Sequence, residues 1–359
     1  MKPNITKVSV NIRRTISVDT GNGLIKTINH VFHAGYIENI FLPGIGSDVL
    51  TFRGKTYTLA DESMPVLNDK TVDERYYILT LFALGKELKG DKEILKLLAE
   101  NEVIEVDLLV GLPLLHYELH KKKFQQYFCN PSVPTVPTVF ELNGKEFRVS
   151  IKSANVFPQG FAAAMTVFGQ LKQSKIVNIV DVGGFTVDCI QLKNLNPNMS
   201  LCTSLYFGVR ELFDKINDQA RALGKKDIAE DVIRDILMEE HPDYSQERID
   251  IVRNAACAFA DRLLEVIAGK GFDIEEEKTV FMGGGAILLE DYFLTSGRAK
   301  KPLFIGDVHA NAKGYALLHN LKNKSNNDSS DKLNSNANSS SNGSVSCNEN
   351  SDGAKRQMA

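Results

Sequence analysis

Short runs of β-branched and aliphatic residues alternate along the chain with segments whose apolar residues recur every three to four positions. The first kind of run predicts buried strands, and the second predicts amphipathic helices. Their alternation is typical of an α/β protein. The clearest strands are expected at residues 15–19, 105–110, 176–182, 186–192 and 279–282.

The most regular helical pattern begins after Ser245 and ends where Gly269 and Gly271 interrupt it. Its apolar positions are Ile249, Val252, Ala256, Phe259, Leu263 and Ile267. Further helices are expected at residues 74–88, 161–171 and 209–223.

One pattern occurs twice: an apolar strand that ends in Asp-x-Gly and is followed by a second apolar run. It covers residues 16–21 and again residues 179–184. Such a repeat predicts two similar halves, each of which contributes an equivalent hairpin to a central cleft.

Residues 322–359 are built almost wholly of Asn, Ser, Asp, Gly and Lys. Because such a segment buries too little apolar surface to offset the entropy of ordering, we expect it to be disordered. The folded body is then expected to run from about residue 5 to residue 321.

The charge balance disfavours direct binding to nucleic acid or to an anionic membrane. With a formal net charge of −3, the chain has no overall basic field. We therefore expect any DNA partner to be reached through an adaptor. No run of roughly 18 apolar residues occurs, so we expect no membrane span.

The five cysteines form no CxxC pair and no Cys/His ligand spacing. Their odd number does not fit a disulfide framework, which favours a reducing cytoplasm.

The first repeated hairpin, residues 19–26, has the composition of an anion-binding turn. Its glycines let backbone N–H groups approach an anion closely, and Lys26 adds a positive charge. Asp19, at the end of the strand, is placed to hold a hydrated Mg²⁺ ion, which prefers oxygen ligands. The alternative is a plain hairpin turn, because Asn-Gly is also a common turn sequence.

The second hairpin, residues 181–188, has the same features and an additional carboxylate. Asp188 returns on the following strand among apolar neighbours, where it would be costly to bury without a partner. This predicts a polar cleft. The alternative is an edge strand on which Asp188 faces solvent.

A third element is a strand that runs into three consecutive glycines, Gly283, Gly284 and Gly285. Because glycine weakens regular elements, close contact between this backbone and a ligand is the favoured explanation. A flexible turn is the alternative.

The order of these elements, over about residues 15–318, resembles that of the superfamily of actin, sugar-kinase and heat-shock-chaperone ATPases. In addition, residues 110–113 resemble its first interlobe connection and residues 306–316 its second. Within the superfamily the chain is most similar to the bacterial ParM-like plasmid-segregation actins, through Gly-Leu-Pro-Leu at residues 111–114 and the compact body.

The resemblance implies a two-lobed actin-like fold of duplicated ribonuclease-H-like domains, with a nucleotide cleft between the lobes. Lobe I would cover residues 1–170, with a small subdomain inserted at about 37–104. Lobe II would cover residues 171–321, with a small subdomain at about 205–275. The last helix, at about 306–321, would return to lobe I.

The resemblance also implies a role for individual residues. Asp19 and Asp181 would govern a hydrated Mg²⁺ ion and the attacking water, and Lys26 would contact the β- or γ-phosphate of ATP or GTP. The remaining nucleotide contacts would be Thr20, Gly21, Asn22, Gly23, Gly183, Gly184, Phe185, Thr186, Gly208, Glu211, Gly283, Gly284 and Gly285.

Gln159 occupies the position that orients the attacking water in this superfamily. Many ParM-like proteins carry Glu there, whereas an amide orients a water but is a poor proton acceptor. The alternative is that Gln159 caps the helix that follows it.

The implied function is nucleotide hydrolysis coupled to filament assembly in the bacterial cytoplasm. The partners would be further copies of the chain and a ParR-like adaptor bound to a centromere-like DNA site. A small-molecule kinase on the same fold is the alternative, although such kinases are usually longer and have a dedicated substrate lobe. A membrane-bound division actin is disfavoured because no terminal amphipathic helix is visible.

Overall fold

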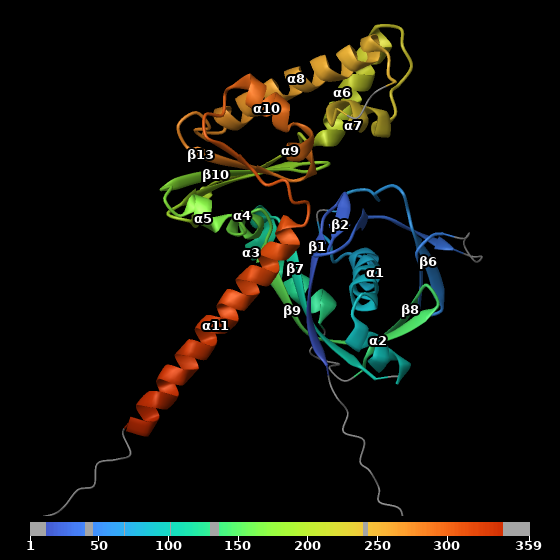
Figure 1. Ribbon diagram of the computed structural model, residues 1–359, viewed down its shortest axis with the longest axis vertical. Coiled ribbons are helices and arrows are strands. Elements are labelled where there is room, and N and C mark those ends of the chain that lie inside the picture. Colours follow the sequence, from blue (N-terminus) through green and yellow to red (C-terminus); the bar gives the residue numbers. More distant parts are fainter. Residues whose placement is uncertain are drawn as a thin grey trace, which may run out of the picture. The chain divides into compact units, whose positions relative to one another are not determined.

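The computed structural model describes residues 12–39, 46–67, 69–100, 102–129, 136–239 and 243–339 (Figure 1). The chain divides into two units, Met1–Leu318 and His319–Ala359. All five predicted strands are present in the first unit, which holds the two sheets.

The first sheet has nine strands, of which β1 and β9 run parallel to β7, the strand between them. Their order is β3 (Val31–His33), β2 (Leu24–Lys26), β1 (Arg13–Thr20), β7 (Ile104–Leu112), β9 (Lys145–Pro158), β8 (Thr138–Leu142), β5 (Val49–Phe52), β6 (Lys55–Leu59) and β4 (Tyr36–Asn39). The strands of the segment expected as a small subdomain, residues 37–104, therefore join the main sheet through β8.

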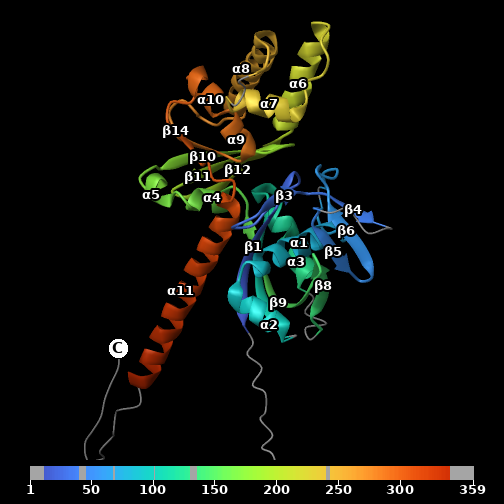
Figure 2. The same ribbon diagram turned by 45° about the vertical axis from the view of Figure 1, so that its right-hand side comes forward.

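Helix α1 (Arg75–Lys89) lies between the β1-β7-β9 part of this sheet and the β8-β6 part (Figures 1 and 2). Most of its residues are buried, including Leu79 and Phe82. Helix α2 (Lys92–Ala99) follows and is capped by Asp91, whose side chain accepts hydrogen bonds from the first turn. The site described below is built at the end of β1, against the start of α1.

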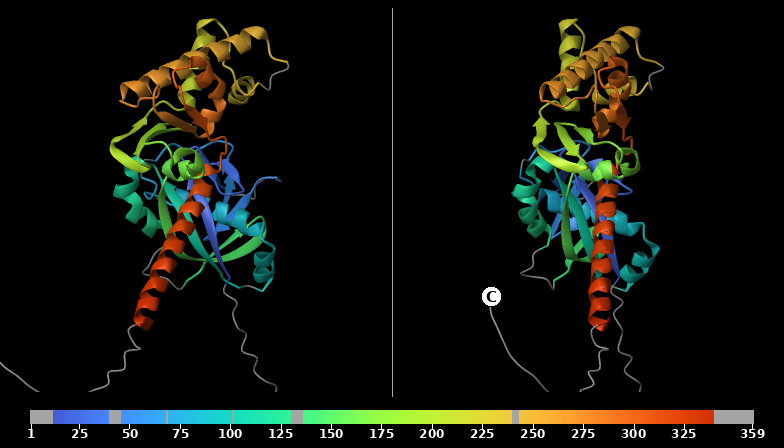
Figure 3. Two further views of the ribbon diagram at one scale, coloured as in Figure 1. Left: turned by 60° about the vertical axis from the view of Figure 1, so that its left-hand side comes forward. Right: turned by 90° about the vertical axis from the view of Figure 1, so that its left-hand side faces the viewer.

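The second sheet has the order β12 (Asn196–Leu205), β11 (Val187–Lys193), β10 (Ile176–Val182), β13 (Lys278–Met282) and β14 (Pro302–Phe304). Along β10 the side chains alternate, so that Val180 and Val182 enter one apolar cluster and Val177 and Ile179 another. The first cluster is covered by α6 (Val209–Ala222), α7 (Glu230–Leu237), α8 (Gln246–Gly269), α9 (Gly284–Leu288) and α10 (Glu290–Ser296), which lie on one face of the sheet (Figure 3).

The prediction that residues 110–113 connect the two lobes is wrong. After β7, helix α3 (Leu114–Phe128) leads back into β8 and β9 of the same sheet. The chain passes to the second sheet only after β9, through α4 (Phe161–Met165) and α5 (Phe168–Leu171). The glycine at residue 111 and the proline at residue 113 mark the end of a strand. A strand must end both where the chain crosses to another sheet and where it returns within the same sheet, so these residues do not distinguish the two cases.

The single helix expected at residues 161–171 is divided into α4 and α5. Thr166 lies at the break, where its hydroxyl donates to the carbonyl of Ala163 at 2.7 Å. Such a side-chain hydrogen bond competes with the backbone hydrogen bonds of a helix. The β-branched Val167, which follows directly, also disfavours a continuous helix.

Helix α11 (Ala310–Ser339) begins in the first unit and continues into the second. Part of the segment expected to be disordered, residues 322–339, is therefore helical in the structure. Adding residues to a helix that has already formed avoids the cost of nucleation, even where no apolar face is present. Residues 340–359, and residues 5–11 at the expected start of the body, lie outside the described part of the chain. No helix among the described residues is long and apolar enough to span a membrane.

Candidate functional site

The two predicted hairpins are brought together at the ends of β1 and β10. Asp19 is the next-to-last residue of β1 and pairs across the first hairpin with Lys26. Asp181, at the end of β10, pairs across the second hairpin with Asp188. The charges of Asp19 and Lys26 both act on the pKa of Asp181, so the hairpins lie within electrostatic reach of each other.

The buried carboxylate of Asp19 accepts hydrogen bonds from three side chains. Gln159 Nε2 donates at 2.6 Å, Tyr315 OH at 3.1 Å and Asn311 Nδ2 at 3.4 Å. Asn311 also acts on Asp181, where it favours the charged carboxylate, so one amide lies close to both aspartates. The residues come from β1, the β9–α4 junction and the first turns of α11, which fixes the orientation of the Asp19 carboxylate.

The side chain of Gln159 does not cap the following helix. The cap position of α4 is Gly160, which has a φ of 71° and forms no side-chain cap hydrogen bond. Gln159 instead uses its backbone N–H to bond the carbonyl of Leu112 at 2.8 Å and its side chain to bond Asp19. Gln159 is therefore held in the site through both its backbone and its side chain.

Burial raises the pKa of Asp181 to about 7, and the facing charge of Asp188 adds to the increase. Lys26 opposes the shift. Burial also raises the pKa of Asp188. Strand β11 lies between β10 and β12, so the alternative of an edge strand with a solvent-facing Asp188 is contradicted. Two neighbouring carboxylates with raised pKa values are a suitable environment for a hard cation, which would restore their charged forms.

The triple-glycine turn packs directly against the second hairpin. Gly283 has a φ of 85°, and a Cβ atom there would lie 2.4 Å from Asp181 Oδ1. A Cβ atom on Gly285 would lie 2.5 Å from Val182 Cγ1 and 2.6 Å from Val209 Cγ2. A Cβ on Gly284 would meet nothing within 4 Å. The turn is thus held by close backbone packing, with open space beside its central glycine.

The start of α6 is attached to the same hairpin by backbone hydrogen bonds. Val209 and Arg210 donate to the carbonyls of Gly183 and Gly184 at 3.1 and 2.9 Å. A Cβ atom on Gly208 would lie 2.5 Å from the Gly184 carbonyl oxygen, so the helix begins in tight contact with the turn.

Other predicted contacts in this region already have partners. The N–H of Gly183 closes the turn by donating to Thr186 at 2.8 Å, and the ring of Phe185 lies 4.9 Å from the Arg210 guanidinium. Glu211, in the first turn of α6, pairs with Lys215 at 3.4 Å.

The polar side chains of the first hairpin point into the first lobe. The hydroxyl of the buried Thr20 donates to the Gly111 carbonyl at 3.5 Å, and Asn22 Oδ1 accepts from Tyr76 OH at 2.5 Å. The Gly23 carbonyl accepts from Ala34 at 3.0 Å. A Cβ atom on Gly21 would lie 2.5 Å from the carbonyl oxygen of Leu24, which makes the turn tight.

Four residues of the site were missed by the sequence analysis: Lys70, Tyr76, Asn311 and Tyr315. Asn311 and Tyr315 are four positions apart on the helix expected at residues 306–321, so their shared face was an available signal. Lys70 follows an aspartate in a polar stretch before α1, where a lysine is ordinarily exposed. Nothing in the local sequence indicates that it is buried.

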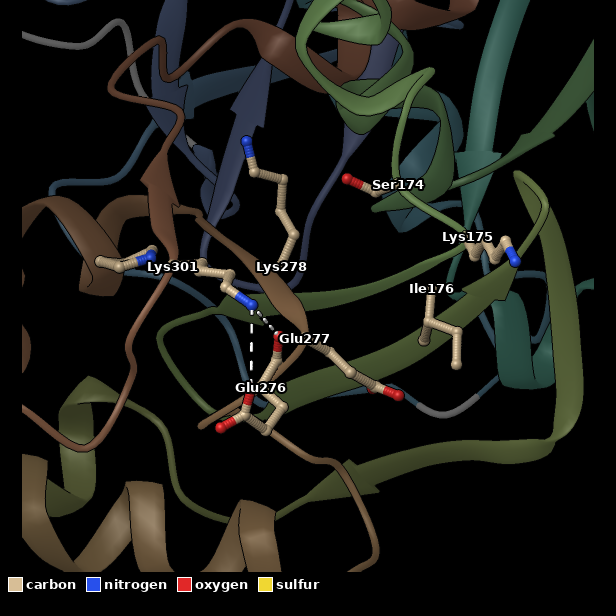
Figure 4. Close-up of a pocket in the computed structure, with 8 residues that line it drawn as sticks. Ser174, Lys175, Ile176, Glu276, Glu277, Lys278 and Lys301 are labelled. Carbon is tan, nitrogen blue, oxygen red and sulfur yellow. Dashed lines mark hydrogen bonds and ion pairs between the residues drawn. The ribbon is translucent and has the colours of Figure 1, made fainter.

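A separate hollow lies elsewhere on the second sheet (Figure 4). It measures about 570 Å³ and lies where β10, β13 and β14 begin, whereas the hairpin site lies where β10 and β13 end. Lys301 Nζ donates to the backbone carbonyl of Glu276 across it (Figure 4). None of the predicted site residues lines this hollow. Ligands generally bind at the carboxyl ends of strands, which is where the hairpin site lies and the hollow does not.

The charged and polar groups of the hairpin site are of the kinds that a magnesium-bound nucleotide requires. Two carboxylates from different sheets would suit the cation, and Lys26 and Lys70 would supply positive charge for phosphates. The backbone of Gly283 packs closely against Asp181, and there is open space beside Gly284. Among the residues that the structure describes, no cluster of three or more His, Cys, Asp or Glu side chains forms a ready-made metal site.

Comparison with known proteins gives two family matches. The model of the N-terminal domain of actin-like proteins matches residues 17–161. The model of the C-terminal part of archaeal MreB-like actin homologues matches residues 179–295. No curated protein sequence matches the chain.

Solved structures of actin homologues share the fold at low identity. The archaeal actin homologue Ta0583 in complex with ADP is 18% identical, with a TM-score of 0.64 over 84% of this chain and 97% of its own. The apo ParM protein of psk41 is 14% identical, with a TM-score of 0.64 over 87% and 98%. A 15-stranded ParM filament from Clostridium botulinum is 17% identical, with a TM-score of 0.62 over 85% and 98%.

The two family matches follow one another along well over half of the chain, and each covers most of one of the two sheets together with its hairpin. The solved structures show the same two-lobed α/β architecture. The chain therefore has the actin-like fold and belongs to the family of actin-like proteins.

Proposed function

We propose that this protein is a nucleotide hydrolase that binds Mg-ATP or Mg-GTP between its two hairpins and assembles into filaments. The observation that carries the proposal is the position of Asn311, which donates to Asp19 at 3.4 Å and also acts on the charge of Asp181. Carboxylates from two different sheets thus meet in one polar site. The ADP bound by Ta0583 and the filament formed by the Clostridium ParM support the same conclusion by analogy of fold.

In this proposal Asp19 and Asp181 hold the hydrated cation, and Lys26 faces the phosphates. The backbones of Thr20, Gly21, Asn22 and Gly23 in the first hairpin, and of Gly184, Phe185 and Thr186 in the second, contact the phosphates. Gly183, whose N–H closes the turn, shapes the second hairpin. The cation supplies charge neutralisation when bound, and hydrolysis then depends mainly on positioning.

Gln159 is proposed to orient the attacking water. Its amide nitrogen is engaged by Asp19, which leaves the amide oxygen as the acceptor that a water requires. Because an amide does not take up a proton at neutral pH, Gln159 acts through position and not as a general base. The nucleoside end of the ligand is assigned to Gly283, Gly284 and Gly285, with Gly208 and Glu211 beside it.

Filament assembly is proposed to proceed by head-to-tail contacts, which generate open polymers from identical copies. Nucleotide that binds the assembled form more tightly would favour growth, and hydrolysis would weaken the contacts. Because the net charge is −3, a role in moving plasmid DNA would require a ParR-like adaptor that carries the basic surface.

The test is to follow light scattering and phosphate release together after Mg-ATP or Mg-GTP is added to the purified protein. We expect scattering to rise first and phosphate release to follow, with release strongly reduced in Asp181→Ala. If phosphate release requires an added small-molecule hydroxyl acceptor and scattering stays flat, the protein is instead a kinase on this fold. No binding of either nucleotide would overturn the proposal entirely.

A further inference from the structure

The turn that follows Lys26 is held by side chains from two distant parts of the chain. Thr27 is fully buried, and its hydroxyl donates to the carboxylate of Glu87 on α1. Glu87 also accepts from the backbone N–H and the side-chain amide of Asn29, at 3.0 and 2.8 Å. The other contact is a 2.8 Å hydrogen bond between Nδ1 of His309 and the backbone carbonyl of Thr27, 282 positions away.

The ring of His309 is the donor in this hydrogen bond. A carbonyl oxygen can only accept, so Nδ1 must carry a proton. The neutral ring with its proton on Nδ1 meets this requirement, and so does the charged ring, in which both nitrogens donate. A side chain without a donor at this place could not make the contact.

His309 belongs to residues 305–309, the connection from β14 of the second sheet to α11. The first residue of this connection is still attached to the second sheet, because its N–H donates to the carbonyl of Phe281 at 2.9 Å. Asp307 fixes the rest of the connection by accepting from the N–H of His309 at 2.9 Å and from Lys313 Nζ at 2.6 Å. The imidazole is therefore held in place relative to the second sheet.

The start of α11 and the residue before it together contact both strands of the first hairpin. On β1, the carboxylate of Asp19 accepts from two side chains of this helix, at 3.4 and 3.1 Å. Just beyond β2, the carbonyl of Thr27 accepts from His309. Asp19 and Lys26 are partners across the hairpin. One segment thus holds the residue proposed to bind the cation and the turn beside the residue proposed to face the phosphates.

Lys26 is the last residue of a very short strand, β2, which has three residues. So short a strand has few ladder hydrogen bonds of its own, and contacts beyond its end help to fix where its last residue lies. The lysine side chain is flexible, so its reach toward a phosphate depends on the position of its backbone. The anchors of Thr27 are the contacts that set this position.

We propose that His309 is a positioning residue for Lys26, which it holds toward the phosphates through the backbone of Thr27. This inference rests on the proposed nucleotide function. It makes the phosphate contact of the first hairpin depend on the connection that leads out of the second sheet. Glu87, the other anchor of the turn, lies on α1 beside the first sheet and does not create that dependence.

The test is a double-mutant cycle on the affinity for Mg-AMP-PNP, measured below the concentration at which light scattering rises. His309→Leu removes the donor, and Lys26→Met removes the charge that it positions. We expect His309→Leu to lose about fivefold in affinity in the wild-type background and less than about 1.5-fold in the Lys26→Met background, because two residues that act through one contact are not additive. His309→Asn supplies an amide donor close to the place of Nδ1 and should stay within about twofold of the wild type.

His33→Leu is the control, because His33 is an exposed histidine on β3 of the same sheet. It should leave the affinity unchanged in both backgrounds. Hydrogen exchange of the nucleotide-free protein gives a second readout. Exchange at residues 27–30 should be faster in His309→Leu than in the wild type, restored in His309→Asn and accompanied by no change in α8.

The inference is overturned if His309→Leu weakens binding equally in both backgrounds, or if it speeds exchange at α8 as much as at residues 27–30, since His309 would then have a structural role only. Exchange at the wild-type rate in residues 27–30 would also overturn it. If the wild-type protein binds no nucleotide, the proposed function fails and this inference fails with it. Those results are distinguishable, because the first is obtained only with a wild-type protein that binds nucleotide.

Discussion

The side-chain amide of Gln159 donates a 2.6 Å hydrogen bond to the carboxylate of Asp19, although the two residues are 140 positions apart. The residue proposed to orient the attacking water is thus held by a residue proposed to hold the cation. Tyr315, whose pKa burial raises well above its ordinary value, donates to the same carboxylate and stays protonated. Cation binding and water positioning are therefore expected to be coupled through Asp19.

Replacing Gln159 with Ala should lower the rate of phosphate release about 100-fold, because one positioned group is lost from the site. Nucleotide affinity should change by less than about threefold, since Gln159 is not proposed to contact the phosphates. Single-turnover phosphate release and equilibrium binding separate the two effects. Gln125→Ala, an exposed glutamine on α3, is the control and should leave both unchanged. Equal losses in binding and in rate would show that Gln159 has a structural role only.

Gly283→Ala should impair catalysis beyond its cost in stability. The new Cβ would be 2.4 Å from Asp181 Oδ1 and would force that carboxylate to move. Gly297→Ala is a matched control, because Gly297 also has a positive φ, 63°, but no atom lies within 4 Å of its added Cβ. Gly297→Ala should lose about 1 kcal/mol in urea unfolding from backbone strain, and Gly283→Ala about 2 kcal/mol, because its Cβ would also lie 2.6 Å from the Val182 carbonyl oxygen. Gly283→Ala should in addition lose at least about tenfold more phosphate release than Gly297→Ala. Equal activities in the two variants would contradict the placement of Asp181.

Gly314→Ala should destabilise the contact between α11 and α4. A Cβ atom on Gly314 would be 2.1 Å from the Ala162 carbonyl oxygen, so the helices would have to separate. We expect a loss of about 2 kcal/mol in the free energy of unfolding, as for other overpacked sites. Gly169→Ala, on α5, meets nothing within 4 Å and should be neutral or slightly stabilising. Urea unfolding that gave the same midpoint for both variants would argue against this packing.

The nucleotide-free protein should become more stable with rising pH through the titration of Lys70. The folded protein releases this proton near pH 8, whereas the unfolded chain keeps it to about 10.5, so the unfolded state binds more protons between these values. The destabilisation caused by the buried charge is thus complete below pH 8 and is removed as the pH rises. The groups that face Lys70 are Asp19, Asp188 and Tyr76, and burial raises the pKa of Tyr76 so that it stays neutral here.

Urea unfolding of the wild type and Lys70→Met at several pH values measures this effect. The difference in free energy of unfolding between them should change by up to about 1.4 kcal/mol per pH unit above pH 8, with the wild type gaining. A difference that stays constant with pH would show that Lys70 is neutral, or fully paired, in the folded protein.

Much of this architecture is encoded locally in the sequence. The two Asp-x-Gly hairpins and the triple-glycine turn could be predicted because sequences of this composition occur in few other structural settings. Strand β10 was predicted with its exact bounds. Helix α8, which covers the second sheet, follows from a regular apolar spacing that ends at glycines.

The features that escaped prediction depend on distant contacts. The sequence at residues 110–113 ends a strand, but nothing in it specifies to which sheet the chain returns. Lys70 is buried where its ammonium group donates to the Thr20 carbonyl, 50 positions away. Tyr315 reaches Asp19 across nearly the whole chain, so its role follows from the folded structure alone.

The central claim is that nucleotide binding between the hairpins drives assembly, and electron microscopy of the purified protein tests it most directly. Samples with Mg-ATP, with Mg-AMP-PNP, with Mg-ADP and with EDTA should be compared at protein concentrations that span the onset of scattering. We predict filaments with Mg-ATP and Mg-AMP-PNP, fewer or none with Mg-ADP, and none with EDTA. Particles that remain single at every concentration, although binding measurements show the site filled by Mg-ATP, would contradict the account.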